Sequence, residues 1–271
     1  MDFILNPFVT VLTFLYSILG HNMVLAIVVF TILVRLLTYP LTAQQMKSTK
    51  AMQAMQPELK KLQEKYNGDR EKLAQAQMAM YKEYGVNPAA GCLPLFIQLP
   101  LFLALYQAIN FALASTPTQL LDLSGRLLIP GLDSVIPLDS NFFGLNLTQP
   151  PNMAGGGLSA IVGIAAVALV VVTTWLQFKV TSPAPAPSED GKPNQAQAMT
   201  QSMGTIMPLM YGFFALSFSI GLSIYFIAGN VIGIVQYALM GRANFSNIFG
   251  GNKPKTTTQP AQVSGKAKRR N

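Results

Sequence analysis

The sequence holds few charged residues and almost none of the residues that build disulfides or metal sites. Only 11% of its 271 residues are charged, against about 25% in an average soluble domain. It has one cysteine, Cys92, and one histidine, His21. A lone cysteine forms no internal disulfide, and a single histidine without a second ligand nearby makes no metal site. We therefore expect no metal and no cofactor.

Catalytic and ion-coupling patterns are also missing. The chain contains no glycine-rich phosphate loop with a lysine, no nucleophile beside a base and no paired carboxylates within an apolar segment. Every acidic residue lies outside the long apolar segments, whereas transporters and proton pumps usually carry an ionisable site inside them. We therefore expect that the protein is not an enzyme, and we keep a small-molecule or ion transporter as the alternative function.

Long apolar segments are what the sequence has in abundance, since 51% of its residues are hydrophobic. A bilayer core of about 30 Å needs about 20 apolar residues in a helix. Segments near this length lie at 21–41, 92–113, 158–179, 203–219 and 221–240. The predicted fold class is an all-α integral membrane protein with five transmembrane helices.

Basic residues are distributed unevenly between the segments that join these helices. Residues 42–86 carry eight basic residues and the tail, 241–271, carries seven, whereas 114–157 has only Arg126 beside three aspartates. Because cytoplasmic loops are enriched in Lys and Arg, we place 42–86, the proline-rich loop 180–202 and the tail in the cytoplasm, and 114–157 outside. Five crossings then put the N-terminus outside and the C-terminus in the cytoplasm. The tail fits either anionic lipid or ribosomal RNA.

The first 20 residues are predicted to form an interfacial helix. A helical wheel places one apolar face there, made of Ile4, Phe8, Val11, Leu15 and Ile18. The Asn6-Pro7 pair interrupts the apolar run and leaves it short for a crossing. A sixth transmembrane helix is the alternative.

Residues 42–86 are rich in helix formers and contain a turn signal at Asn67-Gly68. Apolar residues repeat at helical spacing on both sides of that turn: Met55, Leu59, Leu62 and Tyr66 before it, and Leu73, Met80 and Tyr84 after it. Matched seams of this kind favour an antiparallel helical hairpin over a solvated spacer.

The last two crossings are separated only by about Ile220-Gly221, which predicts a tight helical hairpin at the outer face. Small residues allow helices to approach closely in a membrane. Glycines suited to such contacts are Gly204, Gly212, Gly221, Gly229 and Gly233, of which the last pair has GxxxG spacing.

The segment 21–41 carries one charge, Arg35, and begins after a candidate N-cap, Asn22. An arginine at the centre of a transmembrane helix costs roughly 2.5–3.5 kcal/mol on insertion scales, so it should face a polar cavity or a partner. Thr31 lies one turn earlier on the same face. A positively charged recess that receives an acidic peptide segment is one interpretation. A side chain that snorkels to the cytoplasmic headgroups is the other.

Neutral polar residues inside the other apolar segments usually face neighbouring helices or water. Gln98, Asn110 and Asn230 are of this kind and are weaker candidates for lining a polar recess.

Five motifs follow one another along the chain. They are FTILVRLLTYPLT at 30–42, PELKKLQEKY at 57–66, NPAAGCLPLFIQLPLFLALYQAI at 87–109, WLQFKVTSP at 175–183, and IMPLMYGFF with GLSIYFIAGNVIGIVQ at 206–214 and 221–236. Together they cover most of residues 20–240 and resemble the YidC/Oxa1/Alb3 family of membrane protein insertases. We expect the protein to be of the bacterial type without the large outer domain that some members carry.

The resemblance implies a fold and a function. Five helices would surround a hydrophilic groove that opens to the cytoplasm and the lipid and is closed outside, and the cytosolic hairpin would help to recruit substrates. The protein would act as an insertase and chaperone for nascent membrane proteins in the plasma (inner) membrane of a bacterium. The implied partners are nascent membrane proteins and the lipid bilayer, with the Sec translocon, and the ribosome through the basic tail, as further candidates.

The resemblance also implies roles for particular residues. Arg35 matches the groove arginine and Thr31 the threonine one turn before it. Gln177 lies where the family has a polar groove residue in the third crossing. Phe226 takes the place of an aromatic residue, often Trp or Tyr, that contacts the substrate. Phenylalanine has no polar tip, so it can supply only an apolar contact.

Overall fold

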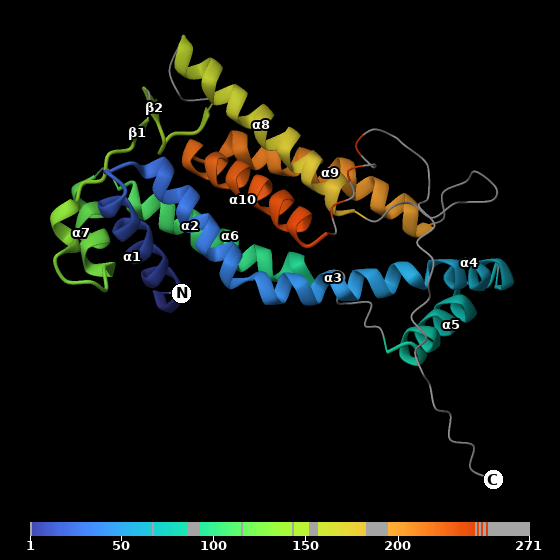
Figure 1. Ribbon diagram of the computed structural model, residues 1–271. Helices are drawn as coiled ribbons and strands as arrows, with labels where there is room; N and C mark the ends of the chain where they lie inside the picture. Colours follow the sequence, from blue (N-terminus) through green and yellow to red (C-terminus); the bar gives the residue numbers. More distant parts are fainter. Residues whose placement is uncertain are drawn as a thin grey trace.

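The computed structural model describes residues 2–66, 68–85, 93–114, 116–142, 144–151, 157–182, 195–241, 243, 245 and 248. Within its helices, the side chains at positions 4, 49, 50, 53, 56, 70, 93–101, 158 and 195–201 are not described. In these ranges the chain is almost entirely helical (Figure 1), and its one sheet is a two-stranded antiparallel hairpin.

The segment that carries Arg35 is shorter than the sequence predicts. Helix α2 runs from Met23 to Leu37, and the Asn22 side chain caps it by accepting a hydrogen bond from the backbone N–H of Leu25, as predicted. The chain then bends by 55° into α3, Tyr39–Ala54. Pro40 has no N–H to donate to the carbonyl of Leu36, so the helical ladder is interrupted there. The expected continuous helix through residue 41 is therefore wrong at its C-terminal end.

Helix α1, Asp2–Ile18, packs against α2 and against α6, Leu93–Ala112. Its buried apolar residues are Leu5, Val9, Leu12, Leu15 and Tyr16. The predicted apolar face is therefore partly wrong, because Val11 and Ile18 are exposed. The helix continues through Pro7.

Residues 116–142 and 144–151 form a folded cap. It contains α7, Pro117–Arg126, a 3₁₀ turn at Leu132–Val135, and the strands β1, Asn141–Phe142, and β2, Leu145–Asn146. The cap is hydrogen-bonded to α1, since the backbone N–H of Leu128 donates to Thr10 and that of Asp139 donates to the Tyr16 hydroxyl. The backbone N–H of Gly221 donates to the Leu147 carbonyl, which ties the cap to the last helix as well.

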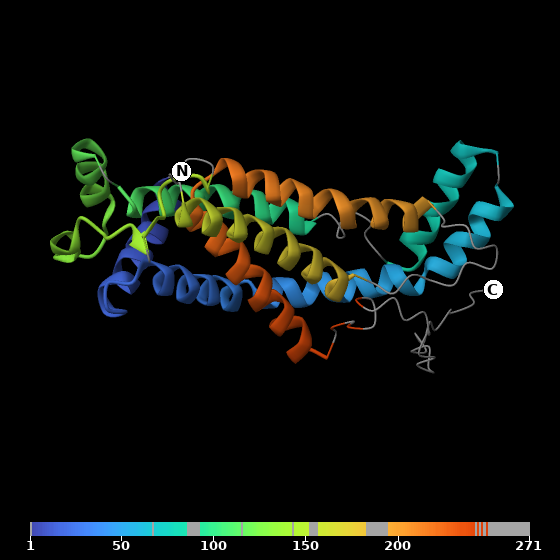
Figure 2. The same cartoon turned by 90° about the horizontal axis from the view of Figure 1, so that it is seen from above.

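Three long helices complete the helical body: α8, Leu158–Thr181, α9, Gln195–Ser217, and α10, Ile220–Leu239. The turn between α9 and α10 is as short as predicted. The two helices nevertheless make few contacts with each other, because α8 packs against both of them (Figures 1 and 2). The hydrophobic core lies where α1, α2, α6, α8 and α10 meet.

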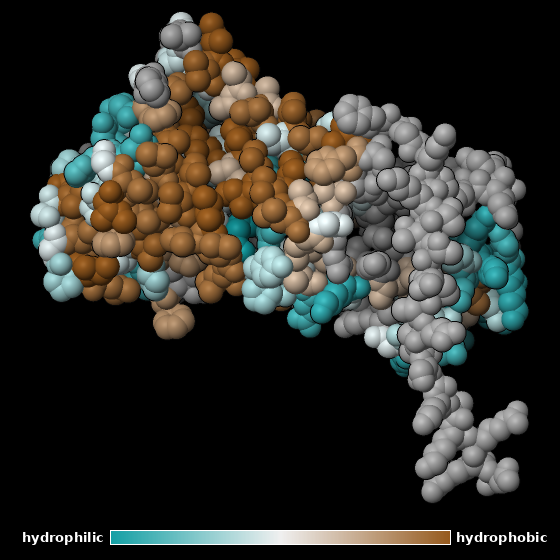
Figure 3. Space-filling view, in the orientation of Figure 1, coloured by the Kyte–Doolittle hydropathy of each residue, from teal (hydrophilic) through white to brown (hydrophobic). Residues whose placement is uncertain are grey.

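The face of the helical body that Figure 3 shows is largely apolar. In the part of the chain that the structure describes, α8 and α10 are long and apolar enough to cross a membrane, and α2 with the first part of α3 makes a third crossing if the bent pair counts as one. Shorter apolar stretches lie at Leu5–Ile18, Phe102–Ala112 and Ser202–Ser217. Helices α3 to α5 extend away from this apolar region (Figure 1).

The hydrophilic extension consists of α3 and a pair of short helices, α4, Gln56–Lys65, and α5, Arg70–Glu83. Met55 and Met80 are buried, as the matched seams require, but Tyr84 is 51% exposed. Tyr84 instead makes a hydrogen bond with Glu58 that raises the pKa of its phenol. The Asp69 side chain caps α5 by accepting from the backbone N–H of Lys72, and the nearby Lys72 ammonium helps to lower the pKa of that carboxyl.

Candidate functional site

Arg35 lies in the last turn of α2 and is half-buried against α10. Its guanidinium donates a hydrogen bond from Nη2 to the backbone carbonyl of Gly229, at 2.8 Å. Figure 3 shows a small hydrophilic area that interrupts the apolar surface between α2 and α10. Among the described residues Arg35 forms no ion pair, so its charge is held by a backbone dipole and is not neutralised.

Two glycines of α10 lie against this contact. A Cβ atom on Gly229 would lie 3.5 Å from Nη2 of Arg35, and one on Gly233 would lie 3.5 Å from Nη1. The same Cβ on Gly233 would collide with the side-chain amide of Gln177. Arg35 of α2 and Gln177 of α8 therefore meet over one short stretch of α10. We call Arg35, Gln177, Gly229 and Gly233 the arginine site.

Thr31 is buried beside the arginine site, and its side chain is already engaged. Its hydroxyl donates to the Ile27 carbonyl at 2.6 Å, and its methyl group approaches Gly229. Thr31 therefore shapes the wall below Arg35 and keeps only the acceptor capacity of its oxygen for a ligand.

Asn230 joins α10 to α8. Its side-chain amide donates to the hydroxyls of Thr173 and Thr174, at 3.0 and 2.8 Å, and the residue is only 5% exposed. Thr173 precedes Gln177 by one helical turn, so the two lie on one face of α8. These two hydrogen bonds therefore hold the part of α8 that carries Gln177 against α10.

Phe226 is buried one turn from Gly229, within a cluster of aromatic rings. Its ring stacks on Phe102 of α6, with centroids 5.7 Å apart, and meets Tyr211 of α9 edge to face at 4.9 Å. Geometries of this kind are favourable for aromatic pairs. Phe226 thus supplies apolar packing where α6, α9 and α10 converge.

The two candidates on α6 contribute less. Asn110 is half-buried and takes no part in the contacts that the structure describes around Arg35. Gln98 lies outside the described side chains. The described residues contain no group of His, Cys, Asp or Glu that could hold a metal ion.

Sequence reasoning missed two features of the site. It treated Gly229 and Gly233 as packing residues and did not expect the Gly229 carbonyl to hold Arg35. It gave no role to Tyr211 or Phe102, the ring partners of Phe226. The GxxxG spacing was a usable signal for the first, whereas the ring partners come from distant helices and leave no local pattern.

Comparisons with known proteins agree on one family. The family model described as "60Kd inner membrane protein" matches residues 14–247. The membrane protein insertase YidC 2 of Bacillus anthracis is 33% identical over 256 residues, covering 93% of this chain and 85% of that protein. The inner membrane protein ALBINO3 of the Arabidopsis thaliana chloroplast is 32% identical, and the match covers 90% of this chain and 51% of that protein.

A solved structure gives the same result. A crystal structure described as that of an active YidC insertase with its first transmembrane domain resolved superposes with a TM-score of 0.52, at 25% identity, over 84% of this chain and 43% of the other. The chain thus spans about half the length of ALBINO3 and less than half of the crystallised insertase. With an arginine site on three of its helices and matches over nearly its whole length, the chain belongs to the YidC/Oxa1/Alb3 family of membrane proteins.

Proposed function

We propose that the protein inserts nascent membrane proteins into the lipid bilayer and helps them to fold, with the arginine site receiving the polar flank of the client. The observation that carries the proposal is the half-buried guanidinium of Arg35, which contacts a backbone carbonyl and no carboxylate of the described chain. A charge in such a position needs a partner. An acidic client segment supplies one.

The mechanism follows from two opposing free energies. Burial of the client's apolar helix in lipid is favourable by about 25 cal/mol per Å². Moving the client's polar flank across hydrocarbon is costly. A polar groove lined by Arg35, Thr31 and Gln177 shortens that path, and the apolar segment leaves sideways into the lipid. Phe226 would contribute an apolar contact at the inner end of the groove.

The membrane topology belongs to the same proposal. Helices α2, α6, α8, α9 and α10 are the five crossings, α1 lies in the outer interface, and the cap faces outside. The C-terminal end of α8, the hairpin of α4 and α5, and the tail are then cytoplasmic, in agreement with the positive-inside rule.

The basic charge of the tail and the family membership point to further partners. Residues 241–271 lie almost wholly outside the described residues, and their basic charge suits a ribosome or an anionic membrane surface. Cooperation with the Sec translocon is a proposal from family membership. A transporter function is not favoured, because the described helices α8, α9 and α10 contain no acidic residue.

Reconstitution tests the proposal. The purified chain, in vesicles of phosphatidylethanolamine and phosphatidylglycerol, should protect the translocated tail of a single-span client from added protease, without nucleotide. Vesicles that lack the chain are the control. If the client tail is protected no better than in vesicles without the chain, and the vesicles show solute flux, the proposed function is wrong and a transporter function is supported.

A further inference from the structure

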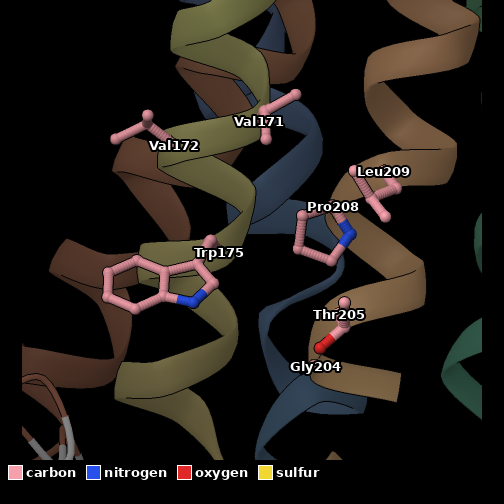
Figure 4. Close-up of a pocket in the computed structure, with 7 residues that line it drawn as sticks. All are labelled: Val171, Val172, Trp175, Gly204, Thr205, Pro208 and Leu209. Carbon is pink, nitrogen blue, oxygen red and sulfur yellow. The ribbon is translucent and has the colours of Figure 1, made fainter. Parts of the chain in front are cut away.

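A shallow hollow lies between α8 and α9, away from the arginine site. It has a volume of about 290 Å³ and is lined by Val171, Val172, Trp175, Gly204, Thr205, Pro208 and Leu209 (Figure 4). We call it the α8–α9 hollow. Ligand pockets for whole small molecules are usually about 300–1,000 Å³, so this hollow suits part of a larger molecule.

One end of the hollow is apolar and the other is polar. Val171 and Leu209 lie toward the middle of the helices, whereas Trp175 and Gly204 lie nearer the proposed cytoplasmic end of α8. Pro208 has no N–H, so the Gly204 carbonyl loses its usual intrahelical donor at the polar end. The indole of Trp175 is 39% exposed at the rim, and tryptophan prefers the membrane interface.

A cation lies near the polar end. The Lys179 ammonium lies 5.7 Å from the centroid of the Trp175 ring. Lys179 is the only charged residue in the sequences of α8, α9 and α10. It follows Val171 by eight residues, which is about 12 Å along a helix. Trp175, which lines the apolar hollow, therefore also brings the Lys179 cation close to it.

We propose that the α8–α9 hollow binds one acyl chain of an anionic phospholipid from the cytoplasmic leaflet, with the phosphate beside Lys179. The charge supports an anionic lipid over an uncharged apolar helix, because the lipid brings a negative group as well as an acyl chain. The assignment of the leaflet rests on the membrane topology proposed above. The site is separate from the arginine site, so a bound lipid and a client occupy the protein together.

Trp175 makes the site directly measurable, because it is the only tryptophan of the chain. The full chain is placed in phosphatidylcholine vesicles that contain increasing fractions of chain-brominated phosphatidylglycerol or, separately, chain-brominated phosphatidylcholine. Bromine quenches the indole on contact. We expect the anionic lipid to reach half-maximal quenching at a several-fold lower fraction than the neutral lipid.

Two variants separate the contribution of the Lys179 charge from that of the space in the hollow. Lys179→Gln should abolish the preference, and Thr205→Phe should reduce it by filling the hollow while leaving the charge in place. Matched controls are Lys47→Gln on α3 and Ile206→Phe, which is exposed beside Thr205 but does not line the hollow. Both controls should keep the preference.

Three results would overturn the proposal. Equal quenching by the two lipids would show that Trp175 meets only the general surrounding lipid. A preference for the anionic lipid that is retained in Lys179→Gln would show that another charge causes it. If an apolar single-span peptide relieves the quenching and neither lipid is preferred, the hollow binds a client helix and not a lipid. The readout involves no insertion, so an inactive insertase would leave it unchanged.

Discussion

Arg35 donates its described hydrogen bond to the Gly229 carbonyl, an acceptor that already belongs to a helix. A backbone carbonyl carries only a partial charge, so a carboxylate is the stronger partner for a guanidinium. A Cβ at Gly229 or Gly233 would only touch the guanidinium, at 3.5 Å, whereas a Cβ at Gly233 would collide with Gln177. At the scale of the residue, the Gly229 carbonyl holds the Arg35 guanidinium as a weak acceptor, and a client carboxylate can replace that carbonyl as a stronger one.

Replacement of Arg35 tests this interpretation. A charge-assisted hydrogen bond contributes about 1.5 kcal/mol or more, which corresponds to about tenfold in an equilibrium. Arg35→Ala should therefore lower insertion of a client with an acidic tail by about tenfold and leave a client with a neutral tail nearly unchanged. Arg35→Lys should retain most of the activity, because it keeps the charge. Lys47→Ala is the matched control. Equal losses for both tails would remove the electrostatic role.

Asn230 is a second test at this scale. Asn230→Ala deletes two hydrogen bonds between α10 and α8. Bonds of this kind contribute about 0.6 kcal/mol each within membranes, so the free energy of unfolding should fall by about 1 kcal/mol. Thermal unfolding in detergent measures the change. Ser217→Ala is the control, because the Ser217 hydroxyl bonds only within its own helix. An equal effect of the two substitutions would show that Asn230 does not tie the helices.

At the scale of the element, a helix cap could be predicted from the sequence, whereas the elements that pack against each helix could not. Asn22 caps α2 as expected, because capping depends on neighbouring residues alone. The break at Thr38 was missed, because the apolar pattern continues through Leu41 and Pro40 was taken as the end of the helix. The buried face of α1 was partly missed as well, since α6 and the cap, distant in sequence, decide which residues are covered.

The contact between α4 and the end of α5 gives a pH dependence. The Glu58 carboxylate raises the pKa of the Tyr84 phenol above its ordinary value of 10.0. The contact therefore stabilises the hairpin fully below about pH 10 and is lost as the pH rises through the higher pKa of the folded state. The phenolate absorbance of the wild type minus that of Tyr84→Phe reports this titration. Glu58→Gln should lower the pKa toward its ordinary value, and an unchanged titration would contradict the pairing.

At the scale of the whole molecule, Arg126 joins parts of the chain that are far apart in sequence. Its guanidinium pairs with Asp2 at 2.9 Å and Asp122 at 3.2 Å, and it lies 4.4 Å from the centroid of the Phe111 ring. Its hydrogen bond and its charge lower the pKa of the Asp2 carboxyl. The cap, α1 and α6 thus share one cation on the side of the molecule that we propose faces outside.

Removal of this cation should loosen α1 without affecting the arginine site. In Arg126→Ala we expect faster amide hydrogen exchange in the first two turns of α1, and unchanged exchange in α10 around Gly229. Asp133→Ala, an exposed change within the same cap, is the control and should alter neither region. Unchanged exchange in α1 would show that its packing against α2 and α6 is sufficient to hold it.

The family could be recognised from the sequence, and the comparisons confirm it, because five motifs in order are specific. The contacts of the arginine site could not be predicted. They depend on α8 packing between α9 and α10, and the short turn before Ile220 suggested a direct pairing of α9 with α10 instead. The aromatic partners of Phe226 come from α6 and α9 and depend on the same arrangement.

Photocrosslinking from the arginine site tests the central claim most directly. A photoreactive residue replaces Gln177, beside Arg35, or Phe213, which is 64% exposed on α9. Each variant is offered a ribosome-stalled single-span client with an acidic tail. The account predicts strong adducts to that tail from position 177, weak adducts from position 213, and loss of the first when Arg35 is also changed to Ala. Equal adducts from the two positions, or none from position 177, would contradict it.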